Sequence, residues 1–238
     1  MGKRWVIPDI HGCSQTLKTL IEEQIKPSRY DALYFLGDYI DRGPDSKGVI
    51  DYIRFLQKDE YTIFLLRGNH EEFALDLYDS EMKAKNNWFL KYSVQKRRAW
   101  KAIGGKETLK SFGIGNIREI PTEYIDWMRT LEYFIQLDDF ILVHAGLNFE
   151  LEDPFEDTRT MLWTREYKID VAKTGNRRIV HGHVPLNTEL IHFHLRNKQY
   201  NFIDLDNGPY IQGKAGFGNL VALELNSMEM VIQDNRDY

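Results

Sequence analysis

Several short apolar runs in this chain end just before a side chain that can bind a metal ion. Each run is only a few residues long, as expected of a buried strand rather than a helix. The runs are Trp5 to Pro8 before Asp9 and His11, Leu33 to Leu36 before Asp38, Ile63 to Leu66 before Asn69, Phe140 to Val143 before His144, and Ile179 to Val180 before His183. Because α/β proteins place their chemistry in loops at the carboxyl ends of strands, we expect these polar side chains to converge.

The side chains that follow the runs form a mixed set of carboxylate, imidazole and amide ligands. Alternate side chains of a strand share a face, so Asp9 and His11 can converge on one ion while Ile10 packs inward. Asp38 offers two oxygens and can bridge two ions about 3.5–4 Å apart, the separation used for displacement at phosphorus. The remaining three ligands would complete the second ion. Such mixed ligation suits Mn, Fe or Zn better than Ca.

Five motifs contain these ligands. They are Asp9-Ile10-His11-Gly12, Gly37-Asp38-Tyr39-Ile40-Asp41-Arg42-Gly43, Arg67-Gly68-Asn69-His70-Glu71, Val143-His144-Ala145-Gly146 and Gly182-His183-Val184-Pro185. In this order they resemble the motifs of the calcineurin-like metallophosphoesterases. Within that family they are similar to the phosphoprotein phosphatase branch, which includes the serine/threonine protein phosphatases and the bacteriophage lambda phosphatase. The resemblance implies two mixed sheets packed as a sandwich between helices, with metals at one edge.

The resemblance implies two divalent metal ions as cofactors, with Mn²⁺ as the expected metal and Fe or Zn as alternatives. One ion would be held by Asp9, His11 and Asp38, and the other by Asp38, Asn69, His144 and His183. A hydroxide that bridges the ions would be the nucleophile, because metal binding can lower the pKa of water to about 7. Pro8 stands where glycine is common in the family, but the strand exit remains available and we expect metal binding to survive.

Further residues of the motifs receive roles from the same resemblance. His70 would act as the general acid that protonates the departing alkoxide, with Asp41 orienting and charging its ring. Arg42 and Arg165 would hold the non-bridging phosphate oxygens by bidentate hydrogen bonds. Arg67 is a further candidate for phosphate binding, with a structural role as the open alternative.

Three functions compete on these residues. The first is hydrolysis of phosphomonoesters, on phosphoserine or phosphothreonine of a phosphoprotein or phosphopeptide, with small phosphomonoesters as substrates in vitro. The second is symmetrical cleavage of diadenosine tetraphosphate. Enzymes of that kind typically lack an aspartate at the position of Asp41 and carry aspartate where this chain has Glu71, so both positions favour the protein phosphatase. The third is a catalytically silent binding module, which the complete set of ligands disfavours.

Composition is consistent with an enzyme of the α/β class. With 238 residues, of which 42% are hydrophobic and 28% charged, residues 1–238 are expected to form one domain. The net charge of −5 argues against binding to nucleic acid. No apolar run of 18 residues and no leading signal segment is found, so we expect a cytoplasmic protein that does not bind membranes.

The pattern of apolar residues predicts the order of the elements. Helices near Ser14 to Glu23 and Ser46 to Gln57 separate the first three strands, which indicates right-handed βαβ units. Residues 72 to about 130 are predicted to form a helical insertion. Hairpin-like strand pairs are predicted around Glu189 to Ile203 and Leu220 to Ile232. In this scheme His192 and His194 would lie on the exposed face of a strand.

Two further side chains lie beside the motifs without a settled role. Cys13 is the single cysteine, which excludes an internal disulfide. It opens the first helix, where a thiolate would be favoured, so redox sensitivity is an alternative to simple packing. His181 could support His183 from behind or could only pack.

The stretch from residue 83 to residue 101 reverses the sign of this acidic protein locally. Its basic residues are Lys83, Lys85, Lys91, Lys96, Arg97, Arg98 and Lys101, and it contains no acidic residue. It is either a solvated helix face or a surface that steers anionic substrates to the metals. Trp88 and Trp100 in the same stretch are expected to pack in the core.

Overall fold

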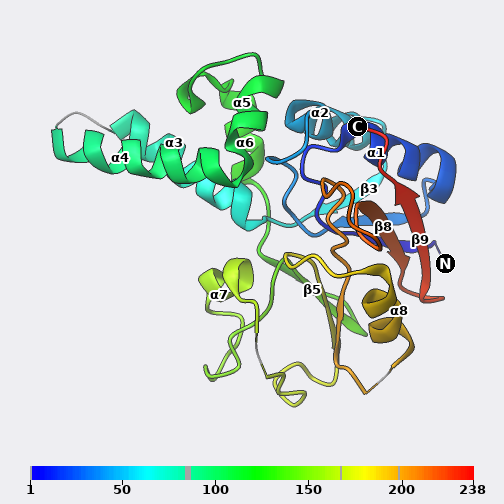
Figure 1. Cartoon of the computed structure of the whole chain (residues 1–238). Helices are drawn as coiled ribbons and strands as arrows, with labels where there is room; N and C mark the ends of the chain where they lie inside the picture. Colours follow the sequence, from blue (N-terminus) through cyan, green and yellow to red (C-terminus); the bar gives the residue numbers. More distant parts are fainter. Residues whose placement is uncertain (1, 84–86, 167, 198) are drawn as a thin grey trace.

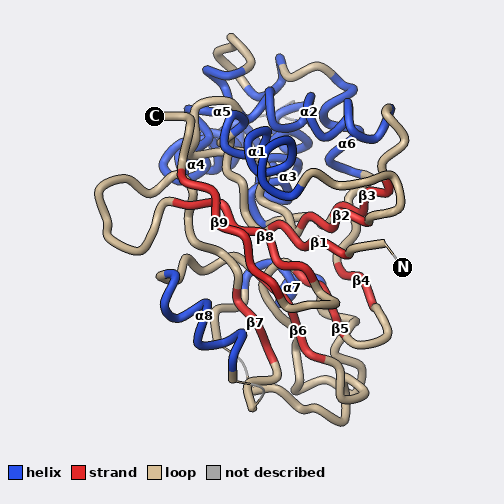
Figure 2. Tube along the Cα trace, turned by 90° about the vertical axis from the view of Figure 1, so that its right-hand side faces the viewer, coloured by secondary structure: helices blue, strands red, loops and turns tan. Residues whose placement is uncertain are grey.

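Two mixed sheets packed face to face form the centre of the structure, a computed structural model that describes residues 2–83, 87–166, 168–197 and 199–238 (Figures 1 and 2). In these residues the first sheet has the order β3 (Thr62–Leu65), β2 (Ala32–Phe35), β1 (Arg4–Ile7), β8 (Asn219–Glu224) and β9 (Glu229–Asp234). The second has the order β4 (Phe134–Gln136), β5 (Phe140–Val143), β6 (Arg178–His181) and β7 (Phe202–Asp204). Each sheet contains parallel and antiparallel neighbours, which confirms the predicted sandwich.

Helices cover the outer faces of the sandwich and fill the connection between the sheets. They are α1 (Ser14–Thr19), continued by a π-helical turn η1 (Leu20–Ile25), α2 (Ser46–Lys58), α3 (Asn69–Lys83), α4 (Asn87–Trp100), the π-helical turn η2 (Lys101–Gly105), α5 (Lys106–Ser111), the 3₁₀ turn η3 (Ile117–Glu119), α6 (Thr122–Arg129), α7 (Thr158–Trp163) and α8 (Thr188–Arg196). The predicted helical insertion corresponds to α3 through α6. Across the described residues, every helix is too short or too polar to cross a bilayer.

Side chains alternate between the two faces of each strand and so build separate layers of core. In β1, Val6 packs with the inner face of the second sheet, where it meets Leu142 and Val180. Its neighbours Trp5 and Ile7 pack instead with the helices on the outer face of the first sheet. Because this alternation has a period of two, a shift of one residue would turn every apolar side chain to the wrong face. The register of strands only four residues long is therefore strongly determined.

Parallel pairing brings the carboxyl ends of the first three strands to one level. Ile7 is paired with Phe35, and Phe35 with Leu65, so the loops that follow β1, β2 and β3 leave the sheet side by side. The helices α1 and α2 connect these strands, which confirms the predicted βαβ units. The sequence motifs therefore meet at one edge because of strand register.

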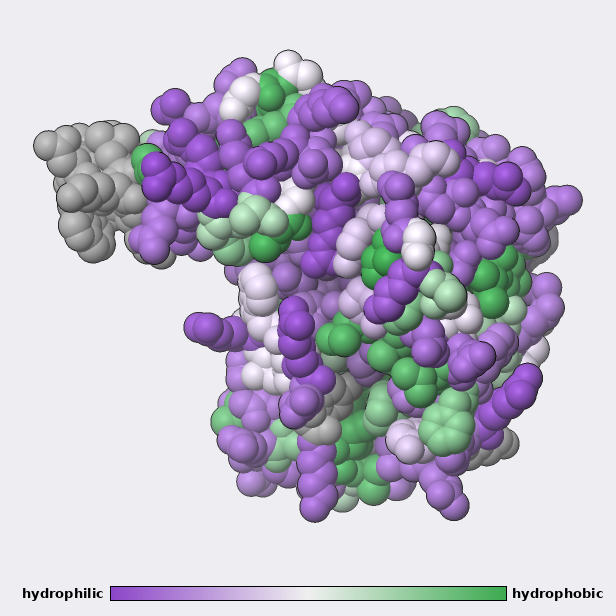
Figure 3. Space-filling view, viewed as in Figure 1, coloured by the Kyte–Doolittle hydropathy of each residue, from purple (hydrophilic) through white to green (hydrophobic). Residues whose placement is uncertain are grey.

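The helices α3 and α4 form an arm that projects from the sandwich (Figure 1), with a largely hydrophilic surface (Figure 3). They pack along one another, and Arg97 of α4 pairs with the buried Glu81 of α3 at 2.6 Å. Lys96 pairs with Asp76. Part of the basic stretch therefore holds the arm together. Lys85 and the side chains of Trp88 and Lys91 lie outside the part of the chain that the structure describes.

One predicted hairpin is wrong. Residues 188–196 form the helix α8, and only Leu220 to Ile232 is the predicted hairpin, made by β8 and β9. The side chain of Asn187 caps α8 by accepting a hydrogen bond from the backbone of Leu190 at 2.8 Å. His192 and His194 are half-buried helical residues and not the exposed face of a strand. The alternation of polar and apolar residues fits a period of two, but the asparagine N-cap that precedes it starts a helix.

Candidate active site

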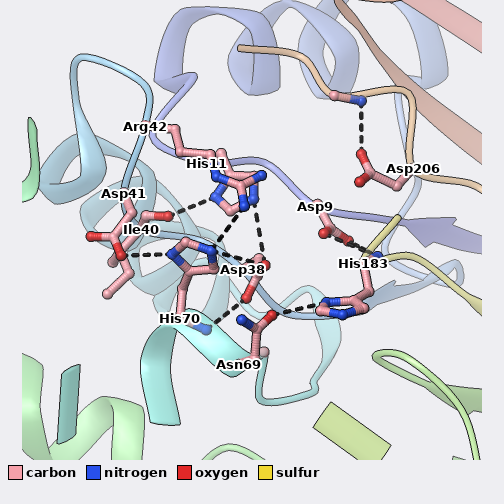
Figure 4. A network of polar contacts seen from close by, with 12 residues as sticks. Asp9, His11, Asp38, Ile40, Asp41, Arg42, Asn69, His70, His183 and Asp206 are labelled. Carbon is pink, nitrogen blue, oxygen red and sulfur yellow. Dashed lines mark hydrogen bonds and ion pairs between the residues drawn. The ribbon is translucent and has the colours of Figure 1, made fainter. Parts of the chain in front are cut away.

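The predicted metal-binding side chains lie together at the edge where the strands of both sheets end (Figure 4). Asp38 is at the centre. One of its carboxylate oxygens lies 3.4 Å from Nε2 of His11, 3.6 Å from Nε2 of His144 and 3.9 Å from Nε2 of His70. Two groups of potential ligand atoms, each within 4.8 Å, share this residue. The groups are His11, Asp38 and His70, and Asp38, His144 and His183.

Asn69 joins the histidines of the second group. Its side-chain oxygen lies 2.9 Å from Nε2 of His144 and 3.0 Å from Nδ1 of His183. The other ring nitrogen of His144 is 3.0 Å from the carbonyl oxygen of Leu36, to which it donates as Nδ1–H. This leaves the lone pair of Nε2 directed at the oxygens of Asn69 and Asp38, an arrangement of acceptors that a cation would relieve.

Two buried ring nitrogens support the same interpretation. Nε2 of His11 and Nε2 of His183 have no hydrogen-bond partner among the described residues. Burial lowers the pKa of His11, of His144 and of His183, the last to about 3, so these rings are neutral and carry a free lone pair. Neutral imidazole is the form that binds metals. The residues present therefore fit a pair of divalent cations.

Asp9 lies at the junction of the two sheets. Both of its carboxylate oxygens are 3.1 Å from the backbone N–H of His183. Burial, Asp206 and Asp38 raise the pKa of Asp9 well above its ordinary value, with a further contribution from Asp204. Asp9 is a member of neither of the two groups around Asp38 in the described residues.

Asp204 and Asp206 are buried acidic residues that the sequence analysis did not select. They lie at the end of β7, and burial raises the pKa of Asp206 to about 7. One oxygen of Asp206 accepts from the backbone N–H of Gly208 at 2.7 Å, and the other has no partner among the described residues. The signal was available, because Asp204-Leu205-Asp206 follows an apolar run as the other motifs do.

His70 and Asp41 form a hydrogen-bonded pair beside Asp38. Nδ1 of His70 lies 2.7 Å from a carboxylate oxygen of Asp41. Burial alone would lower the pKa of His70, but Asp38 and the hydrogen-bonded Asp41 raise it. Asp41 in turn accepts from Nε1 of Trp100 at 2.9 Å and from the hydroxyl of Thr108 at 2.6 Å. The pair is buried and its carboxylate is fully surrounded by donors.

Glu71 holds the backbone of the Asp38 loop. Its two carboxylate oxygens accept from the backbone N–H groups of Asp38 (2.9 Å), Tyr39 (2.8 Å), Ile40 (3.2 Å) and Gly68 (3.0 Å). Burial and the nearby Asp38 raise the pKa of Glu71 to about 8 despite these donors. Sequence reasoning noted Glu71 only as a family difference. Three of these four N–H groups are more than 30 residues away, and such contacts leave no pattern in a single sequence.

Arg42 projects over the site from the loop after β2. Nη2 lies 3.2 Å from Nε2 of His70, and Nη1 donates to the hydroxyl of Tyr210. The ring of Tyr210 also stacks on the guanidinium at 4.5 Å and contacts His11 edge-on at 5.0 Å. Tyr210, in the loop before β8, was not predicted. It sits 168 residues from Arg42, and nothing in its local sequence marks it.

Arg165 is exposed and lines a cavity of about 310 Å³ together with His181, His194 and Asp204. Burial lowers the pKa of His181 to about 4, and its Nδ1 lies 3.1 Å from the carbonyl oxygen of Gly182. Arg165 is close enough to His183 to lower the pKa of that ring. His181 is thus a neutral wall of the cavity beside the site.

Arg67 and Cys13 occupy structural positions. Arg67 binds Glu72 and the hydroxyl of Tyr133, each at 2.9 Å, and the carbonyl oxygen of Arg129, contacts that support the structural alternative for this residue. Cys13 is buried, and burial raises the pKa of its thiol, which supports simple packing over the redox-sensitive alternative. Desolvation of the thiol outweighs the field of the helix α1 that Cys13 precedes.

The backbone of the site is strained. In the described residues nine side-chain-bearing residues have positive φ, and the five at the site are His11, Asp38, Asp41, Arg42 and His183. Such conformations cost on the order of 1–3 kcal/mol each and cluster where geometry must serve function. The tertiary hydrogen bonds of Glu71 and Asp9 hold these turns in place.

Comparison with known proteins places this fold and site in one family. The model of the calcineurin-like phosphoesterases matches residues 2–211, and the chain belongs to that family. Solved structures agree on the fold. A putative diadenosine tetraphosphatase superposes with a TM-score of 0.60 at 21% identity, covering 97% of this chain and 92% of that one. A protein serine/threonine phosphatase from Saccharomyces cerevisiae superposes with a TM-score of 0.63 at 15% identity, covering 100% and 81%.

Relatives of this chain carry names that refer to two different substrates. Serine/threonine-protein phosphatase 1 of Salmonella typhimurium is 27% identical over 230 residues, which cover 92% of this chain and 89% of that protein. The symmetrical bis(5'-nucleosyl)-tetraphosphatase of Hamiltonella defensa is 29% identical over 177 residues, covering 73% of this chain and 52% of that protein. The family is one of phosphoesterases, and the names of these relatives differ in substrate.

Proposed function

We propose that this chain is a two-metal phosphomonoesterase that dephosphorylates phosphoserine and phosphothreonine in proteins. The observation that carries the proposal is the position of Asp38, which is shared by two groups of metal-binding atoms and lies 3.9 Å from His70. A shared carboxylate beside a histidine–aspartate pair suits both activation of water and protonation of a leaving group.

The proposed cofactors are two divalent cations, Mn²⁺ first, with Fe and Zn as alternatives that accept the same donors. The proposed ligands are Asp9, His11 and Asp38 for one ion, and Asp38, Asn69, His144 and His183 for the other. When bound, the ions supply positive charge for the phosphate and lower the pKa of the attacking water.

His70 is the proposed general acid. In the free protein the guanidinium of Arg42 faces Nε2 of His70, so that nitrogen acts as an acceptor. A phosphate offers Arg42 charged oxygens instead, and once Arg42 turns to them, Nε2 can carry the proton for the leaving alkoxide. Asp41, at 2.7 Å from Nδ1, orients the ring and stabilises its charged form.

Arg42 and Arg165 are the proposed phosphate-binding residues. Both approach the ligand cluster, Arg42 through His70 and Arg165 through His183. Two guanidinium groups match a terminal phosphate with three free oxygens and two charges better than a diester, which has two free oxygens and one charge. Arg67 is the weakest member of this set because its donors already bind Glu72, Tyr133 and Arg129.

Two observations support a protein substrate. Asp41 and Glu71 are both present, and each makes several hydrogen bonds at the site. In addition, the relative named as a serine/threonine phosphatase matches nearly the full length of both chains. Symmetrical hydrolysis of diadenosine tetraphosphate is the second candidate, because relatives of that name match at similar identity.

A substrate panel tests the choice. With Mn²⁺ added, kcat/KM should be highest for phosphoserine and phosphothreonine peptides, lower for diadenosine tetraphosphate and lowest for a simple diester such as bis(p-nitrophenyl) phosphate. A kcat/KM for the dinucleotide above that of every phosphopeptide would select the second candidate. Absence of hydrolysis with Mn²⁺, Fe²⁺ and Zn²⁺ alike would refute both and favour a binding module.

A further inference from the structure

Both ends of the arm, the start of α3 and the end of α4, lie at the candidate site. Helix α3 begins at Asn69, so its first turn contains Asn69, His70 and Glu71. Helix α4 ends at Trp100, whose indole N–H reaches Asp41 at 2.9 Å. The chain that follows α4 returns to the site once more, since Thr108 of α5 binds the same carboxylate.

These contacts involve both carboxylate oxygens and the backbone N–H of Asp41. Trp100 donates to Oδ2, which is also the oxygen that faces Nδ1 of His70. Thr108 donates to Oδ1 at 2.6 Å and accepts from the backbone N–H of Asp41 at 2.9 Å. Ser46 accepts from the same N–H at 3.0 Å. The carboxylate therefore has one orientation, and that orientation directs Oδ2 at His70.

The turn between Trp100 and Thr108 also contacts the neighbouring residue. The carbonyl oxygen of Gly104 accepts from the backbone N–H of Arg42 at 3.2 Å. Gly104 has φ 123°, and a Cβ at this position would lie 2.4 Å from the nitrogen of Arg42. Only glycine permits this approach, so the turn fixes the backbone from which Arg42 projects.

We propose that Trp100 and Thr108 are positioning residues for the His70–Asp41 pair, and that Gly104 positions Arg42. The inference rests on the proposed function, because it assigns these residues to the protonation step and to phosphate binding. Each acts through another residue. The indole of Trp100 and the hydroxyl of Thr108 hold Asp41 in the orientation that directs His70 at the leaving group. Gly104 fixes the backbone of Arg42 and so the direction in which its side chain leaves.

The test uses substitutions that remove one donor at a time. Trp100→Phe keeps a buried ring and loses the N–H, Thr108→Val keeps the shape and loses the hydroxyl, and Thr108→Ser retains the hydroxyl. Trp5→Phe is the matched control, because Trp5 is buried and its Nε1 has no partner among the described residues. Each variant is assayed in the full-length, Mn²⁺-loaded protein on a phosphoserine peptide and on p-nitrophenyl phosphate, whose leaving group scarcely needs a proton.

The expected result is selective. Trp100→Phe and Thr108→Val should lower kcat on the phosphopeptide roughly 10- to 100-fold, the range typical of outer-shell partners, and lower it less on p-nitrophenyl phosphate. KM should change little. Thr108→Ser and Trp5→Phe should behave as the wild type, whereas Gly104→Ala should raise KM on both substrates. Equal losses of Trp100→Phe on both substrates, or an equal loss in Trp5→Phe, would overturn the inference.

A substrate-free measurement separates this inference from the proposed function. The Nδ1 proton of His70, observed by NMR, reports its hydrogen bond to Asp41 whether or not the protein is a phosphatase. Its resonance should shift in Trp100→Phe and Thr108→Val and stay in place in Trp5→Phe. An unchanged resonance in a folded Trp100→Phe protein would refute the positioning role. A shifted resonance in a protein that hydrolyses no monoester would refute only the proposed function.

Discussion

The candidate site has two halves that differ in how far the protein itself satisfies them. The acid half consists of Asp41, Arg42, His70 and Glu71, and hydrogen bonds from the protein surround both of its carboxylates. The ligand half consists of Asp9, His11, Asn69, His144 and His183, with Asp204 and Asp206 beside them. Among the described residues, Nε2 of His11 and Nε2 of His183 have no hydrogen-bond partner. This half also contains facing hydrogen-bond acceptors, and buried carboxylates that raise the pKa of their neighbours.

This difference indicates which part of the site is complete without cofactors. The acid half is organised by the fold alone, since its donors come from α4, from α5 and from the loops that contain Asp38 and Gly68. The ligand half places like groups close together, which is unfavourable until a cation lies between them. Asp38 belongs to both halves, because it faces His70 as well as His144.

The largest effect is expected when metal binding by the ligand half is removed. A chelator should abolish hydrolysis, and Mn²⁺ should restore it. Asp38→Asn should cost about 10³-fold or more in kcat/KM, since several kcal/mol of charge stabilisation are lost and about 1.4 kcal/mol corresponds to a factor of ten. Asparagine can still accept from the backbone of His70 through its oxygen, so the loop should stay folded. Full activity of a metal-free sample, verified by metal analysis, would contradict the two-metal assignment.

The second effect isolates the acid half. His70→Asn should lower kcat on alkyl phosphates by roughly 10²- to 10⁴-fold and less on p-nitrophenyl phosphate. Metal content, measured in parallel, should remain that of the wild type because the ligand half is untouched. Loss of metal, or equal losses on both substrates, would move His70 from the acid half to the ligand half.

A third effect compares the two arginines. Arg42→Lys keeps the charge but loses the paired N–H donors of the guanidinium. The loss of a charge-assisted hydrogen bond corresponds to a decrease of roughly 10- to 100-fold in kcat/KM for monoesters. Arg165→Lys should cost less, because Arg165 is exposed and solvent screens it. Steady-state kinetics with one phosphopeptide measure both. A larger loss in Arg165→Lys would place the phosphate nearer to the ligand half.

The smallest effect concerns the stability of the metal-free protein. Burial raises the pKa of Asp206 from 3.8 to about 7, so between these values the folded state binds a proton that the unfolded state releases. Stability should therefore fall as pH rises from about 4 to 7. Asp206→Asn should remove on the order of 1–2 kcal/mol of this decline, because neighbouring carboxylates share the effect. Urea unfolding at pH 5 and pH 7.5 with chelator measures it, and an unchanged decline would exclude Asp206 as a source.

Much of the fold could be predicted because apolar runs and turn residues are local signals. The strands before Asp9, Asp38 and His144 and the paired helices between the first strands follow from such runs. The motif residues then converge because parallel strands end at one level. The error at α8 arose where one pattern fits both a strand and a helix, and only the cap at Asn187 distinguishes them.

The supporting residues could not be predicted in this way. Trp100 and Tyr210 meet their partners only through tertiary structure, at separations of 59 and 168 residues. A tryptophan in an apolar helix is indistinguishable from a core residue until its N–H is seen to reach a carboxylate. Cys13 illustrates the opposite case, where the position before a helix favours a thiolate, burial raises the pKa of the thiol, and simple packing is the alternative that the structure supports.

The contact between Asp9 and the backbone of His183 spans 174 residues and ties the first strand to the second sheet. Closing so long a loop is slow relative to forming helices, so we expect this contact to form after the local helices. Partly folded chains can contain α2 or the arm and still lack any arrangement of ligands. Recovery of hydrolysis during refolding should therefore lag behind recovery of helical circular dichroism, and activity would report the completed sandwich alone.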